Sequence, residues 1–387
     1  DAGGGESNIR RYIIENDLLN AIIQLPNNLF YNTGITTYIW LLSNNKPESR
    51  KGKVQLIDAS LLYRKLRKNL GQKNCEFAPE HIEEILNVYL NGQDVERGLD
   101  ANNDLIGLAS KVFNNSDFGY YKVNIERPDR RKAQFSLERL QPLRFDKSLL
   151  EPMEYMFAEY GDALYQAGKL KDVEKDVLDW CEKQEISLNT KAKAKLFDIK
   201  HWTSLKTLFE HAQAIMAQVG EAESNDFNVF KDNVDKAIKA LDLKLSASEK
   251  NAILNAVSWY DETAEKVLKK VVKLNGDKLA ELLEHLGCEE SDLADFGYFA
   301  TGKKGEFITY ESNADIRDSE SVPLNQRIQQ YFLDEVKPHV DEAWINLDSV
   351  KIGYEISFNK YFYQHKPLRS LEDVAQDILN LEKQADG

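Results

Sequence analysis

The chain has 387 residues, of which 42% are hydrophobic and 29% charged, and its formal net charge is −14. This composition excludes a disordered chain and is typical of a globular protein that is long enough for two or more domains. No apolar run reaches the roughly 18 residues that a membrane-spanning helix needs. The cysteines lie far apart, at Cys75, Cys181 and Cys288, which argues against a disulfide framework. We therefore expect a cytoplasmic protein with no membrane partner.

The charge is distributed unevenly along the chain. Residues 1–75 contain 11 basic and 6 acidic residues, a net charge of +5, whereas the remainder contains 39 basic and 58 acidic residues, a net charge of −19. The basic residues of the first part form short groups at Arg10-Arg11, Arg50-Lys51-Lys53 and Arg64-Lys65 with Arg67-Lys68. Such groups are either solvated surface or contacts with a phosphate backbone. Arg50, Lys51 and Lys53 are the candidate DNA phosphate contacts.

The first 60 residues predict a helix followed by three strands. The chain begins at Asp1 without a methionine, which indicates a piece of a longer protein, and Ser7 to Asn16 predicts an amphipathic helix. Three β-prone runs follow at Ile22–Leu25, Thr36–Leu42 and Val54–Asp58. The basic loop Asn44–Lys53 is short enough to join the last two runs as a hairpin. This order fits the closing part of an α/β sheet.

The loop between the first two runs carries two adjacent aromatic residues, Phe30 and Tyr31. If these side chains are buried, they plug the end of the sheet. If they are exposed, they mark a binding site, because exposed aromatic residues in loops usually have a function.

Residues 61–145 predict a mixed connector. Leu61 to Leu66 indicates a short helix, and Pro79–Leu90 an amphipathic helix with proline in its first turn. Short strands are expected at Ser110–Phe113 and Tyr120–Ile125. Four basic residues within Arg127–Lys132 are either solvated or a contact with DNA or a partner.

From about Asp146 the sequence predicts an almost wholly helical chain. Capping boxes occur at Ser148-x-x-Glu151 and Ser246-x-x-Glu249. Apolar stripes with helical spacing cover Leu170–Trp180, Trp202–Val219 and Phe227–Leu241. The one expected interruption is a hairpin within Tyr298–Tyr310, around a Gly-Lys-Lys-Gly turn.

Near the end of the chain, four apolar residues recur at intervals of three and four positions: Leu371, Val374, Ile378 and Leu381. Two heptads are too short to form a stable coiled coil alone. This seam must therefore pack on its own domain or on a helix of a partner. The sequence contains no His-Glu-x-x-His, Cys-x-x-Cys or Gly-x-Ser-x-Gly, so it predicts no metal site and no hydrolase elbow.

Several stretches together resemble one family. Residues 6–46 (ESNIRRYIIENDLLNAIIQLPNNLFYNTGITTYIWLLSNNK) look like the segment that follows the catalytic motif in methyltransferase (M) subunits of type I restriction–modification enzymes, the N6-adenine DNA methylases. Further stretches resemble the same family in the expected order: Asp117–Tyr120, Ile125–Pro128, Val322-Pro323, Tyr331-Phe332, Glu335-Val336, Ala343-Trp344, Lys351–Phe358 and Tyr361–Tyr363.

The resemblance implies transfer of a methyl group from S-adenosylmethionine to the N6 amine of adenine in DNA. In this family an Asn-Pro-Pro-aromatic motif accepts hydrogen bonds from that amine and orients its lone pair toward the methyl donor. None of the nine prolines of this chain follows an asparagine, and no cofactor fingerprint is visible. We therefore expect that the chain contains no catalytic residues, binds no S-adenosylmethionine and is inactive by itself, whereas the full-length protein uses this cofactor.

The resemblance also implies a target-base pocket. Methyltransferases extrude the base and stack it on apolar or aromatic surfaces. In related N6-adenine methyltransferases an aromatic residue before the terminal hairpin stacks on the adenine, and Phe30 matches that position. Asn32 and Thr33 could orient the base or bind phosphate. The alternative is that Phe30 and Tyr31 only plug the sheet.

The expected architecture is mainly α with an N-terminal α/β piece. Residues 1–60 would hold the terminal strands of a Rossmann-like S-adenosylmethionine methyltransferase sheet, residues 61–145 a connector, and residues 146–387 a helical domain for subunit assembly. The family implies DNA, a specificity (S) subunit and a restriction (R) subunit as partners, and the apolar seam could dock on the S subunit. The alternative is a non-catalytic, mostly helical scaffold or adaptor.

Overall fold

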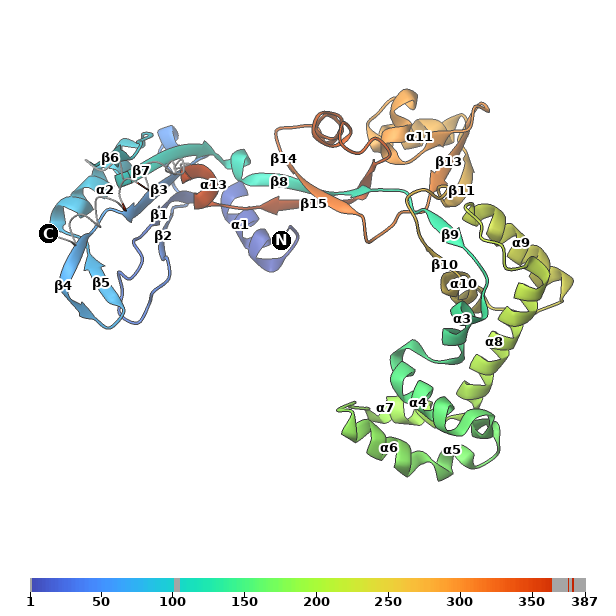
Figure 1. The fold of residues 1–387 in the computed structure, drawn as a ribbon. Helices are drawn as coiled ribbons and strands as arrows, with labels where there is room; N and C mark the ends of the chain where they lie inside the picture. Colours follow the sequence, from blue (N-terminus) through green and yellow to red (C-terminus); the bar gives the residue numbers. More distant parts are fainter. Residues whose placement is uncertain (1, 101–104, 364–374, 376–377, 379–387) are drawn as a thin grey trace. The chain divides into compact units, whose positions relative to one another are not determined.

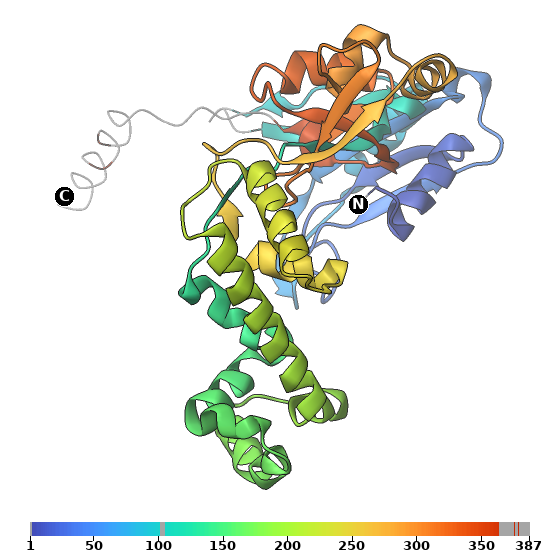
Figure 2. The same cartoon turned by 90° about the vertical axis from the view of Figure 1, so that its right-hand side faces the viewer.

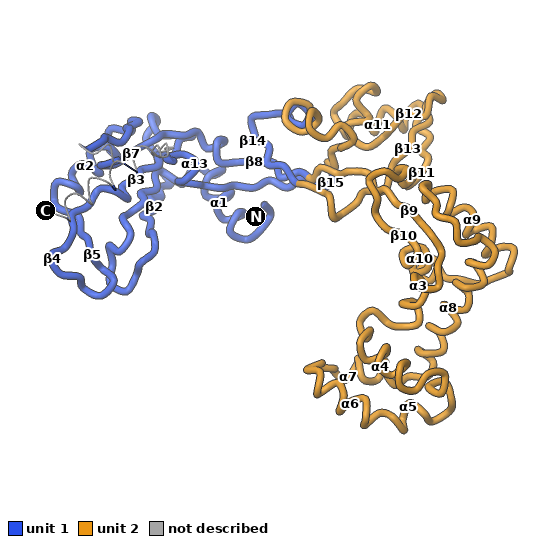
Figure 3. The backbone as a smooth tube through the Cα atoms, in the orientation of Figure 1, with its two compact units in different colours: residues 1–123, 319–332, 348–387 blue, residues 124–318, 333–347 orange. Residues whose placement is uncertain are grey.

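The structure is a computed structural model that describes residues 2–100 and 105–363, together with residues 375 and 378 (Figure 1). It divides into two compact units (Figure 3). Unit 1 comprises residues 1–123, 319–332 and 348–387, and unit 2 comprises residues 124–318 and 333–347. Each unit therefore combines segments that are distant in the sequence. The functional division into catalytic end, connector and assembly domain stays a prediction.

Unit 1 is built around a mixed five-stranded sheet in the order β2-β1-β3-β7-β6. Its strands are β1 (Leu19–Gln24), β2 (Tyr38–Leu42), β3 (Lys53–Leu61), β6 (Gly98–Leu99) and β7 (Leu105–Asn114). β1 and β3 are parallel, and the other neighbours are antiparallel. The three expected strands all form. The expected hairpin between the second and third strands is wrong, because β1 lies between β2 and β3.

The two central strands are buried on both faces. Ile22 and Leu56 belong to one apolar cluster, whereas their neighbours Ile23 and Ile57 belong to another. Successive side chains of a strand point to opposite faces, so the two clusters lie on opposite sides of the sheet. The first cluster includes residues of α1 (Gly5–Glu15) and α13 (Phe358–Phe362), and the second includes residues of α2 (Pro79–Asn91).

β2 forms one edge of this sheet and is largely exposed. Its five residues are all apolar or aromatic, and the exposed fractions are 45% for Tyr38, 44% for Ile39, 41% for Trp40 and 56% for Leu42. Soluble proteins normally cover an apolar edge strand or protect it from pairing, so this exposed apolar strand is unusual for the edge of a sheet.

A separate antiparallel hairpin follows β3. It consists of β4 (Arg64–Leu70) and β5 (Lys73–Glu76), with Gly71 in the left-handed region at φ 65°. The expected short helix at Leu61–Leu66 is therefore wrong. Its apolar residues are compatible with helical spacing, but β3 continues to Leu61 and the chain turns directly into β4.

Residues 137–256 of unit 2 form a helical region. Its helices are α3 (Leu137–Leu140), α4 (Leu150–Tyr160), α5 (Lys169–Asp172), α6 (Glu174–Lys183), α7 (Thr190–Leu196), α8 (Ile199–Val219), α9 (Phe227–Ala240) and α10 (Ala247–Ala256). α9 packs against the long helix α8 around Phe209, Phe230 and Val234 (Figures 1 and 2). A second apolar cluster joins α4 to α7 with the start of α8, where Trp202 is fully buried.

One of the two predicted capping boxes is confirmed, and the other is wrong. Ser246 accepts a hydrogen bond from the Glu249 amide at 3.2 Å and so caps α10, which confirms that capping box. The Ser148 box is wrong. Asp146 instead caps the 3-10 turn that precedes α4, where its Oδ1 accepts a hydrogen bond from the Ser148 amide at 2.9 Å.

After Ala256 the chain is not wholly helical, which corrects the sequence expectation. The later elements are β10 (Ser258–Tyr260), β11 (Leu268–Lys273), α11 (Asp277–Leu286), β12 (Phe299–Ala300), β13 (Glu306–Tyr310), β14 (Asp318–Pro323), α12 (Ile328–Tyr331) and β15 (Trp344–Tyr354). The earlier strands β8 (Gly119–Glu126) and β9 (Arg131–Ala133) pair with them in the sheets β14-β8-β15 and β10-β9, and β11-β13-β12 forms a third sheet. The hairpin β12–β13 matches the one expected within Tyr298–Tyr310. The fold class is therefore mixed α/β rather than mainly α.

Candidate nucleic-acid interface

The aromatic loop leaves the carboxyl end of β1 and forms a tight turn. Phe30 and Thr33 make an isolated antiparallel bridge, and Asn32 between them adopts φ 56°. The Thr33 hydroxyl contacts the Tyr31 carbonyl at 3.4 Å. Phe30 is 47% exposed and Tyr31 63% exposed. These exposed fractions favour the binding interpretation of the two rings over the plugging one.

The β4–β5 hairpin holds this loop in place through its backbone carbonyls. The Asn74 amide donates to the Asn28 carbonyl at 3.1 Å, and Lys73 Nζ donates to the Leu29 carbonyl at 2.6 Å. The Cys75 thiol contacts the Asn27 carbonyl at 3.2 Å, and burial raises the pKa of this thiol. The backbone that precedes Phe30 is thus fixed by β5, although the ring itself is exposed.

A cavity of about 480 Å³ lies between the loop and the hairpin. Five amide side chains line it, from Gln24, Asn27, Asn28, Asn69 and Asn74, together with Tyr63 and Lys65. Gln24 Oε1 is buried and has no hydrogen-bond partner among the described residues. The cavity opens at the carboxyl ends of the parallel strands β1 and β3, the edge at which open α/β sheets generally bind ligands. It can offer hydrogen bonds and one positive charge to a polar or anionic ligand.

The carboxylate at this edge is already paired. Asp58, near the end of β3, forms an ion pair with Arg97 at 2.6 Å, and both side chains are less than a tenth exposed. Arg97 also donates to the Ser60 hydroxyl at 3.0 Å, and the Ser60 amide donates to Asp58 at 3.0 Å. These contacts fix the end of β3 and leave Asp58 without the freedom that an acid or base needs.

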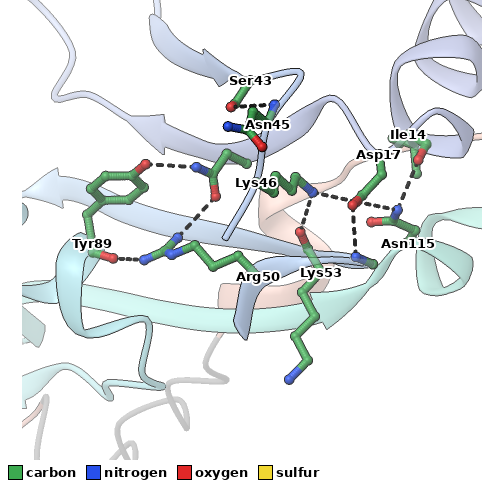
Figure 4. Close-up of polar contacts among 11 residues, drawn as sticks. Ile14, Asp17, Ser43, Asn45, Lys46, Arg50, Lys53, Tyr89 and Asn115 are labelled. Carbon is green, nitrogen blue, oxygen red and sulfur yellow. Dashed lines mark hydrogen bonds and ion pairs between the residues drawn. The ribbon is translucent and has the colours of Figure 1, made fainter. Parts of the chain in front are cut away.

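The predicted phosphate contacts lie elsewhere, in the loop before β3 and at the first residue of that strand, Lys53 (Figure 4). The Arg50 guanidinium donates to Asn20 and Gln55, at 3.2 Å each, and to the Tyr89 carbonyl. It also lies 4.5 Å from the centre of the Tyr89 ring. Its hydrogen-bonding capacity is therefore largely used within unit 1.

The two lysines of that prediction differ. Lys51 pairs with Glu48. Lys53 is exposed, and Figure 4 shows its side chain pointing away from the neighbouring polar cluster.

Lys46, in the same loop, is a buried cation that sequence reasoning did not single out. Its side chain is 1% exposed, and its Nζ donates to Asp17 at 2.6 Å and to the Lys53 carbonyl at 2.8 Å. Burial by itself would raise the pKa of Asp17, but hydrogen bonds from Lys46, Asn115 and the Gly52 amide outweigh it and lower that pKa. The loop is thus fastened to the fold by its own charges.

The two predicted parts of the interface do not form one site. The aromatic loop follows the carboxyl end of β1, whereas Lys53 begins β3, which is parallel to β1. They therefore lie near opposite ends of these parallel strands. β1 has six residues, so its length separates the two ends by about 20 Å. The basic group that lies beside the aromatic loop is instead Arg64-Lys65 with Arg67-Lys68, in β4, whose partner strand β5 contacts that loop.

Three of the four basic residues in the run Arg127–Lys132 pair with carboxylates of the chain. Arg130 binds Glu342 at 2.6 and 2.8 Å, Arg131 binds Asp129 at 2.6 Å, and Lys132 binds Asp261 at 3.1 Å.

Of the apolar seam, Leu371, Val374 and Leu381 lie outside the described residues. Ile378 is helical and 53% exposed.

The described part of the chain contains neither a cluster of metal-binding side chains nor a membrane-spanning helix. Within residues 2–100 and 105–363, His, Cys, Asp and Glu side chains form no group of three that could hold a metal ion. No helix in the described part of the chain is long and apolar enough to cross a membrane.

Comparison with known proteins places the similarity at the N-terminal end. A model of the N-6 DNA Methylase family matches residues 1–118. The methylase subunit of the type I restriction enzyme MjaVII from Methanocaldococcus jannaschii is 44% identical over 94 residues, which cover 24% of this chain and 16% of that protein. The methylase subunit of the type I restriction enzyme HindI from Haemophilus influenzae is 48% identical over 54 residues, 14% of this chain and 12% of that protein.

A solved structure is also similar in part. The type I restriction-modification system methyltransferase subunit from Streptococcus thermophilus is 26% identical, with a TM-score of 0.23, over 29% of this chain and 20% of that chain. The matched stretches span at most about a fifth of the length of these proteins.

Proposed function

We propose, from the match of residues 1–118 to the model of the N-6 DNA Methylase family, that the chain is the C-terminal part of a type I modification subunit. The whole subunit would transfer a methyl group from S-adenosylmethionine to N6 of adenine in DNA. The chain would contribute the target-base side of the reaction, and its partners would be DNA, an S subunit and an R subunit.

The observation that carries this proposal is an exposed aromatic ring held on a fixed backbone. Phe30 is 47% exposed, yet the three carbonyls of Asn27, Asn28 and Leu29 are all bound by β5. An extruded base needs a flat apolar surface that is already in place, and stacking on an aromatic ring contributes about 1–3 kcal/mol. Asn32 and Thr33, in the same turn, would orient the base or bind a phosphate.

We assign the chemical step to the part of the protein outside this chain. The donor group, S-adenosylmethionine, supplies the methyl, and the Asn-Pro-Pro-aromatic motif that would orient the amine is absent from the 387 residues. The chain alone should therefore bind DNA weakly and not methylate it.

The test uses the complete modification subunit that contains this chain, assembled with its S subunit. Phe30→Ala should lower the rate of methyl transfer from labelled S-adenosylmethionine to DNA about ten-fold or more, because the stacking contact is lost. Tyr12→Ala removes an aromatic residue that is similarly exposed, at 64%, but lies in α1, and it should leave the rate unchanged. A normal rate with folded Phe30→Ala would refute the role of the ring.

The docking of the apolar seam is a separate proposal. Deleting residues 370–387 from the complete subunit should reduce its co-purification with the S subunit. Undiminished co-purification would reject docking through Leu371, Val374, Ile378 and Leu381.

A scaffold or adaptor is the second candidate, and the extensive helical clusters of unit 2 favour it. The coding sequence upstream of Asp1 separates the two. A Gly-rich cofactor loop and an Asn-Pro-Pro-aromatic motif within a couple of hundred residues would support the modification subunit.

A further inference from the structure

We propose that the β4–β5 hairpin binds the sugar–phosphate backbone of DNA beside the target base, with Lys65, Arg67 and Lys68 as the phosphate contacts. The proposal rests on the proposed function, because it takes DNA as the ligand of this edge of the sheet. It adds a site that the aromatic loop does not supply.

The first support is that these cations are available. Lys65, Arg67 and Lys68 are all exposed, and within the described residues none of them makes a hydrogen bond or an ion pair with another side chain. Arg64 differs, because it pairs with Glu76 at 2.9 Å. A phosphate contact requires a cation that is not already neutralised, since the gain comes from releasing the counterions of the nucleic acid.

The second support is the position of the hairpin. The strand that carries these cations is paired with β5, and β5 fixes the carbonyls of the aromatic loop. Even the turn of the hairpin reaches the loop, because a Cβ placed on Gly71 would lie 3.4 Å from Asn32 Oδ1. Phosphates bound here would therefore flank a base stacked on Phe30, which is where the backbone of the extruded nucleotide must pass.

The third support is the chemistry of the cavity wall. Lys65 and Tyr63, which is 37% exposed, line the cavity together with the five amide side chains. No acidic side chain lines this cavity in the described part of the chain. A groove that combines a cation with an aromatic ring is typical of proteins that bind unpaired nucleic acid, because the cation follows the backbone and the ring stacks on a base.

An acidic protein surface is the competing ligand for three free cations. It would make use of the charge but not of the amide-lined cavity or of Tyr63. DNA uses all three, so the described residues favour it.

The experiment measures binding of the full chain to a fluorescein-labelled 20-nucleotide single strand over a series of salt concentrations. The test variant is Lys65→Gln with Lys68→Gln. The matched control is Lys200→Gln with Lys231→Gln, which removes two exposed lysines from α8 and α9. Thermal unfolding of each variant confirms that it is folded.

We expect the test variant to bind several-fold more weakly at low salt. The slope of log affinity against log salt should become shallower by about 1.4, since each phosphate contact on a single strand contributes about 0.7. The control should keep the wild-type slope. An unchanged slope in the folded test variant, or equal displacement of the DNA by polyglutamate at matched charge, overturns the hairpin site.

The outcome is separable from that of the proposed function. If the slope falls but the complete subunit never methylates DNA, the hairpin site stands and the methylase role fails. If the complete subunit methylates DNA in a Phe30-dependent way but the slope is unchanged, only the hairpin site fails.

Discussion

Two basic segments of unit 1 lie near opposite ends of the parallel strands β1 and β3 and use their charge in different ways. In the loop Asn44–Lys53, Lys46 is buried against Asp17, and Arg50 is bound by two side chains and a carbonyl. In the β4–β5 hairpin, Lys65, Arg67 and Lys68 are exposed and unpaired among the described residues. The first segment uses Lys46 and Arg50 to close the fold, and the second keeps Lys65, Arg67 and Lys68 available for a ligand.

This contrast shows why a count of charges along a sequence does not locate a nucleic-acid interface. Both segments contribute to the net charge of +5 in residues 1–75, and both look alike as sequence. What separates them is whether a carboxylate or carbonyl elsewhere in the chain reaches the cation. The electrostatic part of the free energy of binding DNA comes from cations that remain solvated in the folded protein.

The largest expected effect is on stability, at Lys46. Lys46→Ala should lower the free energy of unfolding of unit 1 by about 2–4 kcal/mol, because it leaves Asp17 and the Lys53 carbonyl without their buried partner. Hydrogen exchange of the β1 and β3 amides measures this loss. The control Lys51→Ala, at an exposed position nearby, should change it little. A loss as small as that of the control would mean that the loop is not fastened by its charge.

A smaller loss is expected at Arg50. Arg50→Lys keeps the charge but cannot reproduce the fork that reaches Asn20, Gln55 and the Tyr89 carbonyl, so it should cost about 1–2 kcal/mol by the same exchange measurement. Arg67→Lys makes the same change on the exposed hairpin and should cost almost nothing. Equal costs for the two substitutions would remove the distinction between the segments.

The smallest expected effect is on the pH dependence of stability, which tests the ion pair of the same loop. Burial alone would raise the pKa of Asp17, but hydrogen bonds from Lys46, Asn115 and the Gly52 amide lower that pKa below its usual 3.8. Because the folded pKa lies below the unfolded one, the charged carboxylate contributes stability that is fully present above about pH 4. This contribution is lost as the pH falls through the folded pKa. Asp17→Asn should therefore flatten the acid limb of a thermal stability profile, and an unchanged acid limb would contradict the pairing.

The sequence predicted the elements of this region better than their arrangement. The β-branched and aromatic residues of Thr36–Leu42 and Val54–Asp58 identified β2 and β3, and the Ser246 capping box identified the start of α10. Strand pairing was not predictable, because local pattern does not say that β3 pairs in parallel with β1 rather than with β2. The turn from β3 into β4 was missed because leucines at Leu61, Leu62 and Leu66 fit a helical stripe equally well.

The candidate site stays a prediction. Phe30 could be proposed from its place before β2, and the structure leaves its side chain 47% exposed. The hairpin that holds its loop could not be proposed, because the contacts of Lys73, Asn74 and Cys75 join residues more than 40 positions apart. The burial of Lys46 was equally hidden, since it depends on Asp17 reaching across from the end of α1.

The most direct measurement compares the two edges of the sheet in one binding series. Two double variants of the full chain are compared: Lys65→Gln with Lys68→Gln, and Lys51→Gln with Lys53→Gln. For each, the affinity for the same single-stranded DNA is determined over a series of salt concentrations. A DNA-binding edge at the carboxyl ends of β1 and β3 predicts a shallower slope, by about 1.4, for the hairpin pair only. A slope that falls for the Lys51 and Lys53 pair and not for the hairpin pair would place DNA at the opposite edge and contradict it.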